Sequence, residues 1–354
     1  MRALLIASIL TFAYGATAQA AAWTIDDIGN VQVSALNNKG QVIGYTDTST
    51  SLPAAFSWKA GAFTTLPQLP GQTYSSTYAW GINDSGVIVG SSGRNAVVWN
   101  NGTPSALAPN PHFQPTEGYA INNKGTIAVS DTGEFFPDDI STYIVDNGQI
   151  GATVPGYTAV GLNDAGVLLG GTEGHGGVRG VIHDTVAGTT SYLSSWYGGG
   201  FEAINNQGVV VGAYAECDEN DCAPGRPYNW TTHQFLPGGV GSAFDINDAG
   251  DIVGAISDPY IGTPHAVLWD ASGDMLDLGS IPEVIASGWT SLDRAVAIND
   301  MGIILGYGTI NGEQHAFLLS PVPEPSTYAF FGIGLAILGL VAKKRGRSTP
   351  SASA

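Results

Sequence analysis

One nine-residue pattern occurs seven times between residues 36 and 306 of this 354-residue chain, and it restricts the possible folds more than any other feature. The pattern is Leu or Ile, Asn, Asn or Asp, any residue, Gly, any residue, an aliphatic residue, any residue and Gly. One copy ends in Val129 instead of Gly. The seven Asn residues at its second position are Asn37, Asn83, Asn122, Asn163, Asn205, Asn247 and Asn299. Their spacing, close to forty residues, indicates a repeated structural unit.

The pattern itself predicts a β-hairpin. Asn and Asp side chains can bond nearby backbone N–H groups, and the Gly three residues after the Asn can adopt a positive φ. This combination is typical of a type I turn closed by a G1 bulge. The flanking residues alternate between apolar and polar, so strands are expected at positions such as 78–82 and 87–91.

Two further strand signals accompany each hairpin. A run ending in an aromatic residue follows it, as at Trp58, Trp99 and Trp269, and a short strand precedes it, as at 65–67 and 276–279. The first unit has its own version of the preceding strand at 24–29. Four strands in each of seven units predict an all-β fold, a seven-bladed β-propeller over residues 21–320.

The N-terminus predicts export. Arg2 precedes an apolar run over residues 3–18, and the run closes on Ala18-Gln19-Ala20. A basic start, a short apolar core and a small-residue cleavage site define a secretory signal peptide, here residues 1–20. Cleavage is expected after Ala20, with Ala22 as the second choice.

The C-terminus predicts a membrane-anchored tail. Residues 321–327 form a linker that contains Pro323, Glu324 and Pro325, and residues 328–342 carry no charge. As a helix this segment covers about 22 Å of the ~30 Å hydrocarbon core, which snorkelling basic side chains can complete. The basic residues are Lys343, Lys344, Arg345 and Arg347. The positive-inside rule places residues 343–354 in the cytoplasm and the propeller outside.

This tail resembles the PEP-CTERM sorting signal, in which a Pro-Glu-Pro motif precedes a short hydrophobic helix and a basic end. The resemblance implies recognition by an exosortase and delivery from the inner membrane to the surface or extracellular matrix of a Gram-negative bacterium. The polar extension at 348–354 departs from the family, whose members usually end sooner. The repeats at 23–320 resemble the HAF-repeat family through His315-Ala316-Phe317 and His265-Ala266-Val267. That second resemblance implies an exported repeat protein and supplies no activity.

Charge excludes nucleic acid as a partner. The chain has twelve Lys and Arg against thirty Asp and Glu. Arg2, the four basic tail residues and Glu324 lie at the ends, which leaves seven basic and twenty-nine acidic residues, a net charge of −22, on the region between them. Such a field repels phosphate backbones and attracts divalent cations.

One acidic loop contains both cysteines. Cys217 and Cys222 enclose four residues, and in an exported protein such a pair predicts a disulfide that contributes about 2 kcal/mol. The enclosed Asp218, Glu219 and Asp221 lack the spacing of an EF-hand. We therefore interpret this loop as a solvated acidic tip, with a calcium site as the alternative.

No catalytic motif stands out, and no cofactor is expected apart from calcium. His265 and His315 occupy equivalent repeat positions, which favours packing at a strand edge over a ring of metal ligands. Asp84, Asp164, Asp248 and Asp300 are expected to serve their own turns rather than bind calcium. These patterns favour a non-enzymatic binding or structural protein of the cell envelope or matrix, in contact with acidic exopolysaccharide. The alternative is a polysaccharide lyase or hydrolase that uses Glu117, Glu283 or Asp293 from the irregular segments 109–117 and 280–293.

Overall fold

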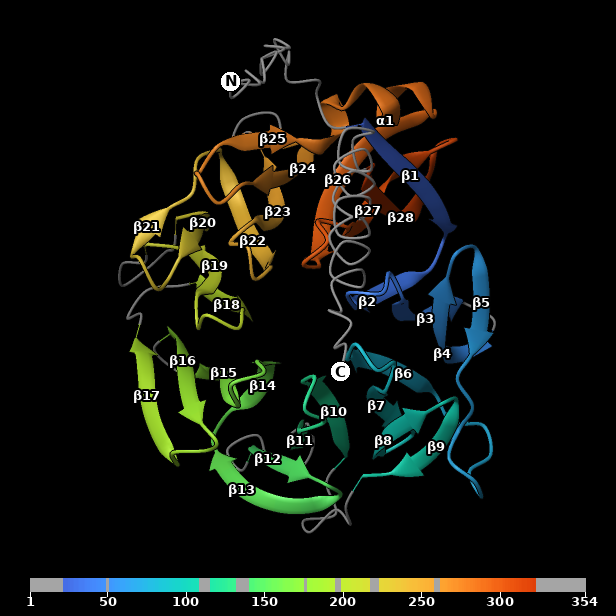
Figure 1. Cartoon of the computed structure of the whole chain (residues 1–354), viewed down its shortest axis with the longest axis vertical. Helices are drawn as coiled ribbons and strands as arrows, with labels where there is room; N and C mark the ends of the chain where they lie inside the picture. The colour runs from blue at the N-terminus through green and yellow to red at the C-terminus, as the bar shows by residue number, and fades with distance from the viewer. Residues whose placement is uncertain are drawn as a thin grey trace, which may run out of the picture. The chain divides into compact units, whose positions relative to one another are not determined.

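The computed structural model describes residues 22–48, 51–107, 115–131, 140–174, 177–194, 199–216, 223–257 and 262–322. Residues Trp23–Ser320 form one compact unit. Seven antiparallel sheets, each of four strands, are arranged around a central axis (Figure 1). The predicted all-β class and the seven-bladed propeller are therefore confirmed.

The first three blades contain the following strands, from the innermost to the outermost. Blade 1 has β2 (Gln32–Leu36), β3 (Val42–Thr48), β4 (Ser51–Lys59) and β5 (Ala62–Thr65). Blade 2 has β6 (Thr77–Ile82), β7 (Ile88–Ser92), β8 (Asn95–Asn100) and β9 (Thr103–Ala106). Blade 3 has β10 (Thr116–Ile121), β11 (Ile127–Asp131), β12 (Ser141–Asp146) and β13 (Gln149–Pro155).

The other four blades follow the same order. Blade 4 has β14 (Thr158–Leu162), β15 (Val167–Gly174), β16 (Gly177–Asp184) and β17 (Thr189–Ser194). Blade 5 has β18 (Gly199–Ile204), β19 (Val210–Tyr214), β20 (Arg226–Asn229) and β21 (Gln234–Phe235). Blade 6 has β22 (Val240–Ile246), β23 (Ile252–Ser257), β24 (Pro264–Trp269) and β25 (Met275–Asp277). Blade 7 has β26 (Trp289–Ile298), β27 (Ile304–Ile310), β28 (Glu313–Val322) and β1 (Ala22–Gly29), and the 3₁₀ turn η2 (Leu278–Ser280) and helix α1 (Pro282–Ala286) precede it.

The repeated pattern forms the turn between the two innermost strands of each blade, as predicted. In blade 2, Gly86 has a φ of +83° and donates its N–H to the carbonyl of Asn83 at 3.0 Å. The Asn83 side-chain oxygen accepts the N–H groups of Ser85 and Val87 at 3.1 and 3.0 Å. All seven equivalent Gly residues have a positive φ, at Gly40, Gly86, Gly125, Gly166, Gly208, Gly250 and Gly302.

Each innermost strand also contains a β-bulge, which the sequence pattern does not reveal. In blade 2 the register shifts between Ala79 and Gly81, so Trp80 has no partner on β7. Equivalent shifts occur in the other six blades. The last Gly of the pattern lies opposite this bulge. It has to be Gly in blade 2, because a Cβ at Gly90 would collide with the carbonyl of Tyr78. In blade 3, Val129 replaces that Gly and Gly118 stands opposite it.

The hydrophobic core lies between neighbouring blades. One cluster joins Ile43 and Ala55 of blade 1 to Val97 and Trp99 of blade 2. The aromatic residues at the ends of the third strands are the largest of these buried groups: Trp99 and Trp269 are fully buried, and Trp58 is 3% exposed. Because each blade buries its faces against two others, the ring has to close to complete the core.

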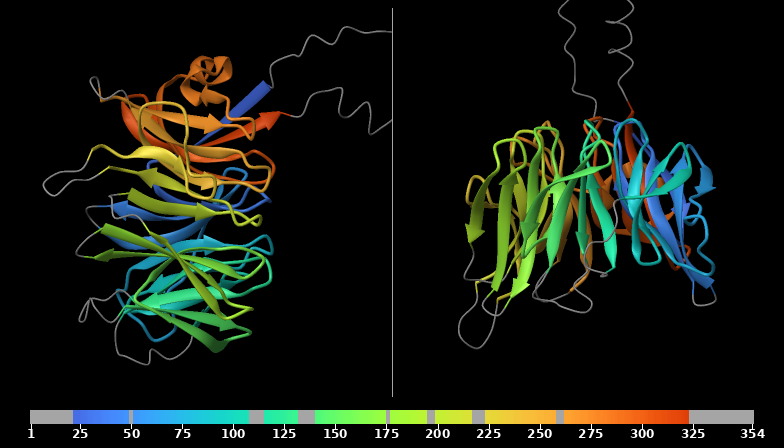
Figure 2. Two further views of the ribbon diagram at one scale, coloured as in Figure 1. Left: turned by 90° about the vertical axis from the view of Figure 1, so that its left-hand side faces the viewer. Right: turned by 90° about the horizontal axis from the view of Figure 1, so that it is seen from below.

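The strand at 24–29 does not belong to the first blade, so its assignment to the first unit was wrong. It is β1, the outermost strand of blade 7, and it lies beside β28 near the other end of the chain. The reason is geometric. The short strand that precedes each hairpin in the sequence is the outermost strand of the previous blade. Because the blades form a ring, the blade that precedes blade 1 is blade 7. Side views show the connections between strands gathered at two opposite faces (Figure 2).

Several predictions fall on residues outside the described ranges. They concern the signal peptide at 1–20, the pair Cys217 and Cys222 with Asp218, Glu219 and Asp221, and the tail from Pro323 onward with its apolar segment 328–342. In the described part of the chain, no helix has the length and apolar character needed to cross a membrane.

Candidate functional site

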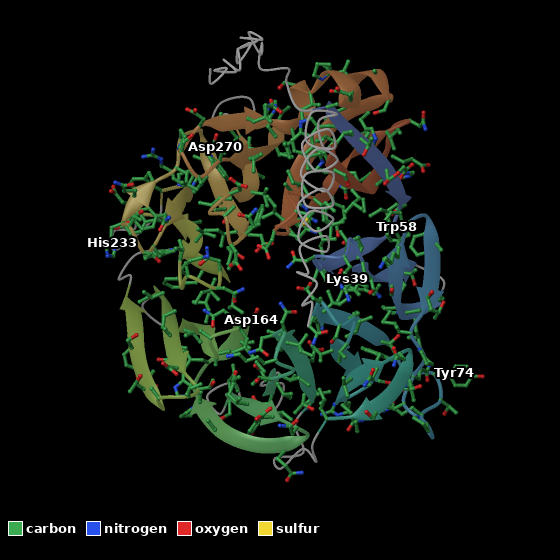
Figure 3. All side chains as sticks on the ribbon, viewed as in Figure 1. Lys39, Trp58, Tyr74, Asp164, His233 and Asp270 are labelled. Atoms are coloured by element: carbon green, nitrogen blue, oxygen red, sulfur yellow. The ribbon has the colours of Figure 1, made fainter. Side chains whose placement is uncertain are left out.

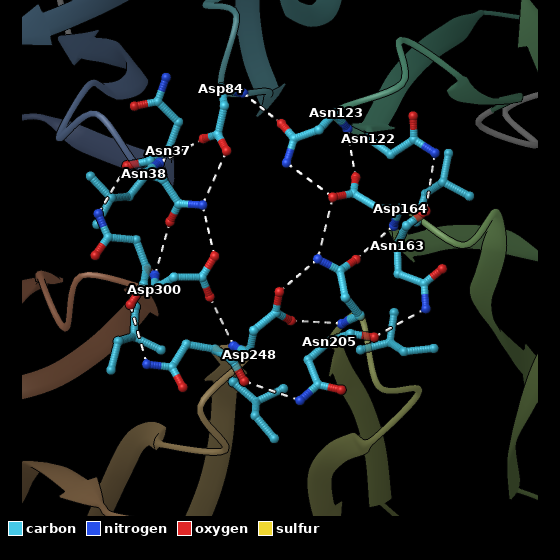
Figure 4. Close-up of a pocket in the computed structure, with 18 of the residues that line it drawn as sticks. Asn37, Asn38, Asp84, Asn122, Asn123, Asn163, Asp164, Asn205, Asp248 and Asp300 are labelled. Carbon is cyan, nitrogen blue, oxygen red and sulfur yellow. Dashed lines mark hydrogen bonds between the residues drawn. The ribbon is translucent and has the colours of Figure 1, made fainter. Parts of the chain in front are cut away.

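The seven repeated Asn residues form a closed ring of hydrogen bonds around the central axis. The Nδ2 atom of each donates to the main-chain carbonyl of the equivalent Asn in the next blade, at 3.0–3.2 Å, and Asn299 returns the ring to Asn37 (Figure 4). All seven side chains are 3–5% exposed. Their oxygens hold their own turns, so each Asn serves the turn and the contact between blades together.

The next residue of each repeat forms a second ring. Its members are Asn38, Asp84, Asn123, Asp164, Asn206, Asp248 and Asp300. Each main-chain N–H donates to a side-chain Oδ1 of the next blade at 2.7–2.9 Å. Amide groups lie between carboxylates: the Nδ2 of Asn206 donates to Asp164 and Asp248.

This second ring corrects the expectation that the Asp residues serve their own turns. Their carboxylates accept N–H groups from the turn of the adjacent blade. They line a polar pocket of about 180 Å³ together with the Asn residues, and Asp164 lies close to the axis in Figure 3. Among the described residues, no group of three or more His, Cys, Asp or Glu side chains is placed to hold a metal ion. Because their side chains are engaged in hydrogen bonds between neighbouring blades, we interpret both rings as structural.

Asp245 departs from the repeat beside these rings. Two residues before the Asn, the other blades carry Ala35, Gly81, Ala120, Gly161, Ala203 and Ala297. The carboxyl of Asp245 accepts the N–H of Ile246 at 2.9 Å and that of Ile298, in the next blade, at 2.8 Å. Burial raises its pKa to about 7, against the lowering effect of these two bonds.

The pKa of Asp245 predicts a pH-dependent stability. Because the folded pKa lies above the value of about 3.9 in an unfolded chain, the contribution is complete below pH 4 and is lost as the pH rises through 7. The loss amounts to about 4 kcal/mol at most. Asp245→Ala, which restores the residue of four other blades, should therefore gain stability relative to wild type between pH 4 and 8. Urea unfolding across this range measures the difference, and parallel curves for the two proteins would contradict the assignment.

A row of aromatic side chains lies farther along the innermost strands. Tyr78 and Trp80 of blade 2 have ring centroids 5.6 Å apart and are nearly parallel, at 4°. Trp80 continues the row to Tyr119 of blade 3, at 6.4 Å and 14°. Tyr45 of blade 1 meets Tyr78 and Trp80 edge-on, at 4.9 and 5.6 Å. All four side chains are partly exposed.

Glu117 of β10 lies within this row. It accepts the hydroxyl of the buried Ser91 at 3.2 Å. Burial raises its pKa, while hydrogen bonding with Ser91, Tyr119 and Trp80 acts in the opposite direction. The pKa of the Tyr119 hydroxyl is raised, first by burial and then by the negative charge of Glu117. The indole Nε1 of Trp80 is buried beside the Glu117 carboxyl.

The two repeat histidines each pair with an Asp on the outermost strand of their own blade. His315 Nδ1 lies 2.8 Å from Asp27 of β1, and His265 Nδ1 lies 3.2 Å from Asp277 of β25. His265 and Asp277 also line a pocket of about 490 Å³ with Ser257. No hydrogen bond joins Ser257 to His265 among the described contacts.

The other carboxylates proposed for an enzyme are not brought to Glu117. Glu283 lies in the first turn of α1 and Asp293 in β26, both in the segment of blade 7, whereas Glu117 belongs to blade 3. No second carboxylate perturbs the pKa of Glu117. The sequence signalled this residue as a non-repeated polar group. It did not reveal the aromatic row around it, because those residues occupy different strands.

Comparison with known proteins identifies the tail. Residues 321–345 match the PEP-CTERM protein-sorting motif, which confirms that prediction. No curated protein matches the sequence. The resemblance of residues 23–320 to HAF repeats stays a prediction.

Solved structures resemble the propeller only distantly. A puromycin-hydrolysing peptidase from Mycobacterium tuberculosis is 13% identical with a TM-score of 0.49, over 81% of this chain and 53% of the peptidase. This chain thus spans about half the length of that enzyme. The β-propeller domain of the trilobed protease from Pyrococcus furiosus is 11% identical with a TM-score of 0.46, over 84% and 85% of the two chains. A putative TolB from Agrobacterium tumefaciens is 12% identical with a TM-score of 0.44, over 80% and 99%.

Proposed function

We propose that this chain is an exported propeller that an exosortase sorts from the inner membrane to the cell surface or extracellular matrix, where it binds polysaccharide without turning it over. The observation that carries the proposal is the sorting motif at 321–345, which begins directly after a compact unit that ends at Ser320. The motif suggests export and membrane-associated processing. The propeller then supplies a rigid scaffold with connections exposed on two faces.

The way the chain uses its polar residues supports a binding role. The repeated Asn and Asp side chains are engaged in the two rings, and their hydrogen bonds hold the blades together. Because the region between the chain ends carries a net charge of −22, contact with an acidic polysaccharide requires divalent cations between the two. An uncharged polysaccharide requires none.

The second candidate function is that of a glycoside-cleaving enzyme, and Glu117 favours it. A carboxyl whose pKa is raised by burial suits a general acid. Glycoside hydrolysis generally needs a second carboxyl about 5–10 Å away. None of the described contacts of Glu117 supplies one. We therefore place this candidate second.

Sorting can be tested in a host that has an exosortase. The double variant Pro323→Ala with Pro325→Ala should still be exported but should stay in the membrane fraction at the precursor mass. Pro321→Ala, at the edge of the motif, is the matched control and should be processed as wild type is. Fractionation and intact-mass measurement report both results. A double variant that reaches the matrix with the wild-type mature mass would contradict the sorting proposal.

A further inference from the structure

Because the seven blades share one fold, comparing equivalent positions of the repeats shows which residues the fold requires. Positions that carry the same residue, or only Asn or Asp, in all blades serve the fold, as the two rings do. Three residues before the Asn, at the bulge, the blades differ: they carry Ser34, Trp80, Tyr119, Val160, Glu202, Phe244 and Val296. Five residues before the Asn they carry Gln32, Tyr78, Glu117, Thr158, Gly200, Ser242 and Arg294. Since Ser, Val and Gly are compatible with these positions, the fold alone does not require Trp80, Tyr78 or Tyr119.

Three of the four aromatic residues at these two positions lie in one sector of two neighbouring blades. Blades 2 and 3 supply Tyr78, Trp80, Glu117 and Tyr119, and blade 1 adds Tyr45. At about 3.3 Å per residue, the bulge lies about 10 Å from the Asn ring along the strand, toward the opposite end of the channel. This sector is therefore separate from the polar pocket of the two rings.

We infer that this sector is a binding subsite for uncharged pyranose units of a polysaccharide. The three near-parallel rings have centroid separations of 5.6 and 6.4 Å, and all three side chains are partly exposed. The C–H face of a pyranose packs on such rings, and its hydroxyls need a few fixed polar partners at the rim. Glu117 is a hydrogen-bond acceptor between the rings of this row, held by Ser91 at 3.2 Å.

The partly exposed aromatic faces and the neighbouring Glu117 carboxyl suit one kind of ligand, which is apolar on one side and carries hydroxyls at its edge.

Charge selects an uncharged sugar over an acidic one. Glu117 places a carboxyl at the row, whereas Arg294, the Arg that stands five residues before the Asn in blade 7, is stacked on Tyr307 of the same blade at 4.4 Å. A uronate would meet the negative charge of Glu117 and the field of the whole propeller. The inference thus rests on the proposed role in polysaccharide binding and specifies its ligand.

Calorimetric titration of the full chain, purified in a mild detergent, tests this inference. The probes are uncharged tetrasaccharides of glucose, galactose, mannose and N-acetylglucosamine, and a uronate tetrasaccharide with and without calcium. At least one uncharged probe should bind saturably. Trp80→Ala should weaken it by about tenfold or more, equivalent to about 1.4 kcal/mol, and Glu117→Gln by several-fold.

Phe244→Ala is the matched control, because Phe244 occupies the same bulge position in blade 6. It should change the affinity by less than about twofold, comparable to a neutral interface contact. Trp80→Phe keeps an aromatic face of smaller area, so it tests the site with little risk to folding and should have an intermediate affinity. Equal losses in the Trp80→Ala and Phe244→Ala variants, or no binding of any uncharged probe, would overturn the subsite.

The same samples distinguish failure of the sugar subsite from failure of the proposed polysaccharide-binding function. Binding of the uronate probe alone, and only with calcium, would overturn the subsite and leave a polysaccharide-binding protein. Chromatography of the probes after incubation detects cleavage. Cleavage that depends on Trp80 would support the sugar subsite and overturn the non-enzymatic role.

Discussion

A chain that lacks residues 22–29 should not fold as a stable monomer. These residues form β1, the outermost strand of blade 7, and they come from the opposite end of the sequence to β28 beside them. Ile28 is 3% exposed in a core cluster with Val33 and Phe56 of blade 1 and Leu318 of β28. Without β1, the cluster loses that side chain and β28 becomes an unpaired edge ten residues long, a template for aggregation.

The expected result is loss of the cooperative melt together with formation of soluble oligomers. Size-exclusion chromatography and thermal melts followed by circular dichroism measure both. A synthetic peptide of residues 22–29 added in excess should restore part of the monomer, because it can pair with β28. The control variant, Thr24→Ser with Asp26→Asn, changes only exposed side chains of the same strand and should melt as wild type does. If the deleted protein melts cooperatively within a few degrees of wild type, β1 does not close the ring.

The architecture could be predicted because its signals are local and repeated. Asn83 and Gly86 lie in one turn, so a turn can be recognised from neighbouring residues, and Trp58 and Trp99 mark strands by short runs. The pairing of β1 with β28 is not local. The sequence at 24–29 has the same strand pattern whether that strand pairs with the first blade or with the last. Only the closure of the ring determines which of the two blades it joins.

The candidate site was less accessible to prediction for a related reason. Nothing near Asp84 indicates that its carboxylate accepts the N–H of Asn38, 46 residues away. The tendency of Asp to bond nearby backbone N–H groups led us to expect that Asp84 serves its own turn. Likewise Trp80, Glu117 and Tyr119 are separate residues in the sequence. They become one surface because the bulge sets Trp80 apart in its strand and the blade rotation brings Tyr119 beside it. These three residues could have been found from the sequence by comparing equivalent positions across the seven repeats.

Substitution of one Asn in the buried ring should cost several kcal/mol. Asn205→Ala removes three hydrogen bonds: the one from Nδ2 to the carbonyl of Asn247 at 3.0 Å, and those accepted from the N–H groups of Gln207 and Val209 at 3.1 and 2.9 Å. Asn205 is 5% exposed, so water cannot readily replace them. At about 1–3 kcal/mol for each group left unpaired, the free energy of unfolding should fall by about 3–9 kcal/mol.

Urea unfolding of Asn205→Ala beside Gln207→Ala gives this value with a control from the same turn. Gln207 is exposed and contributes only its main-chain N–H to the turn, so Gln207→Ala should stay within about 0.5 kcal/mol of wild type. Asn205→Asp then separates the two roles of the side chain. Its carboxylate can still accept from Gln207 and Val209, but it cannot donate to Asn247 and it buries a charge. Its cost should therefore grow as the pH rises above about 4, where a free Asp ionises. An Asn205→Ala variant as stable as the Gln207→Ala control would show that the ring does not hold the blades together.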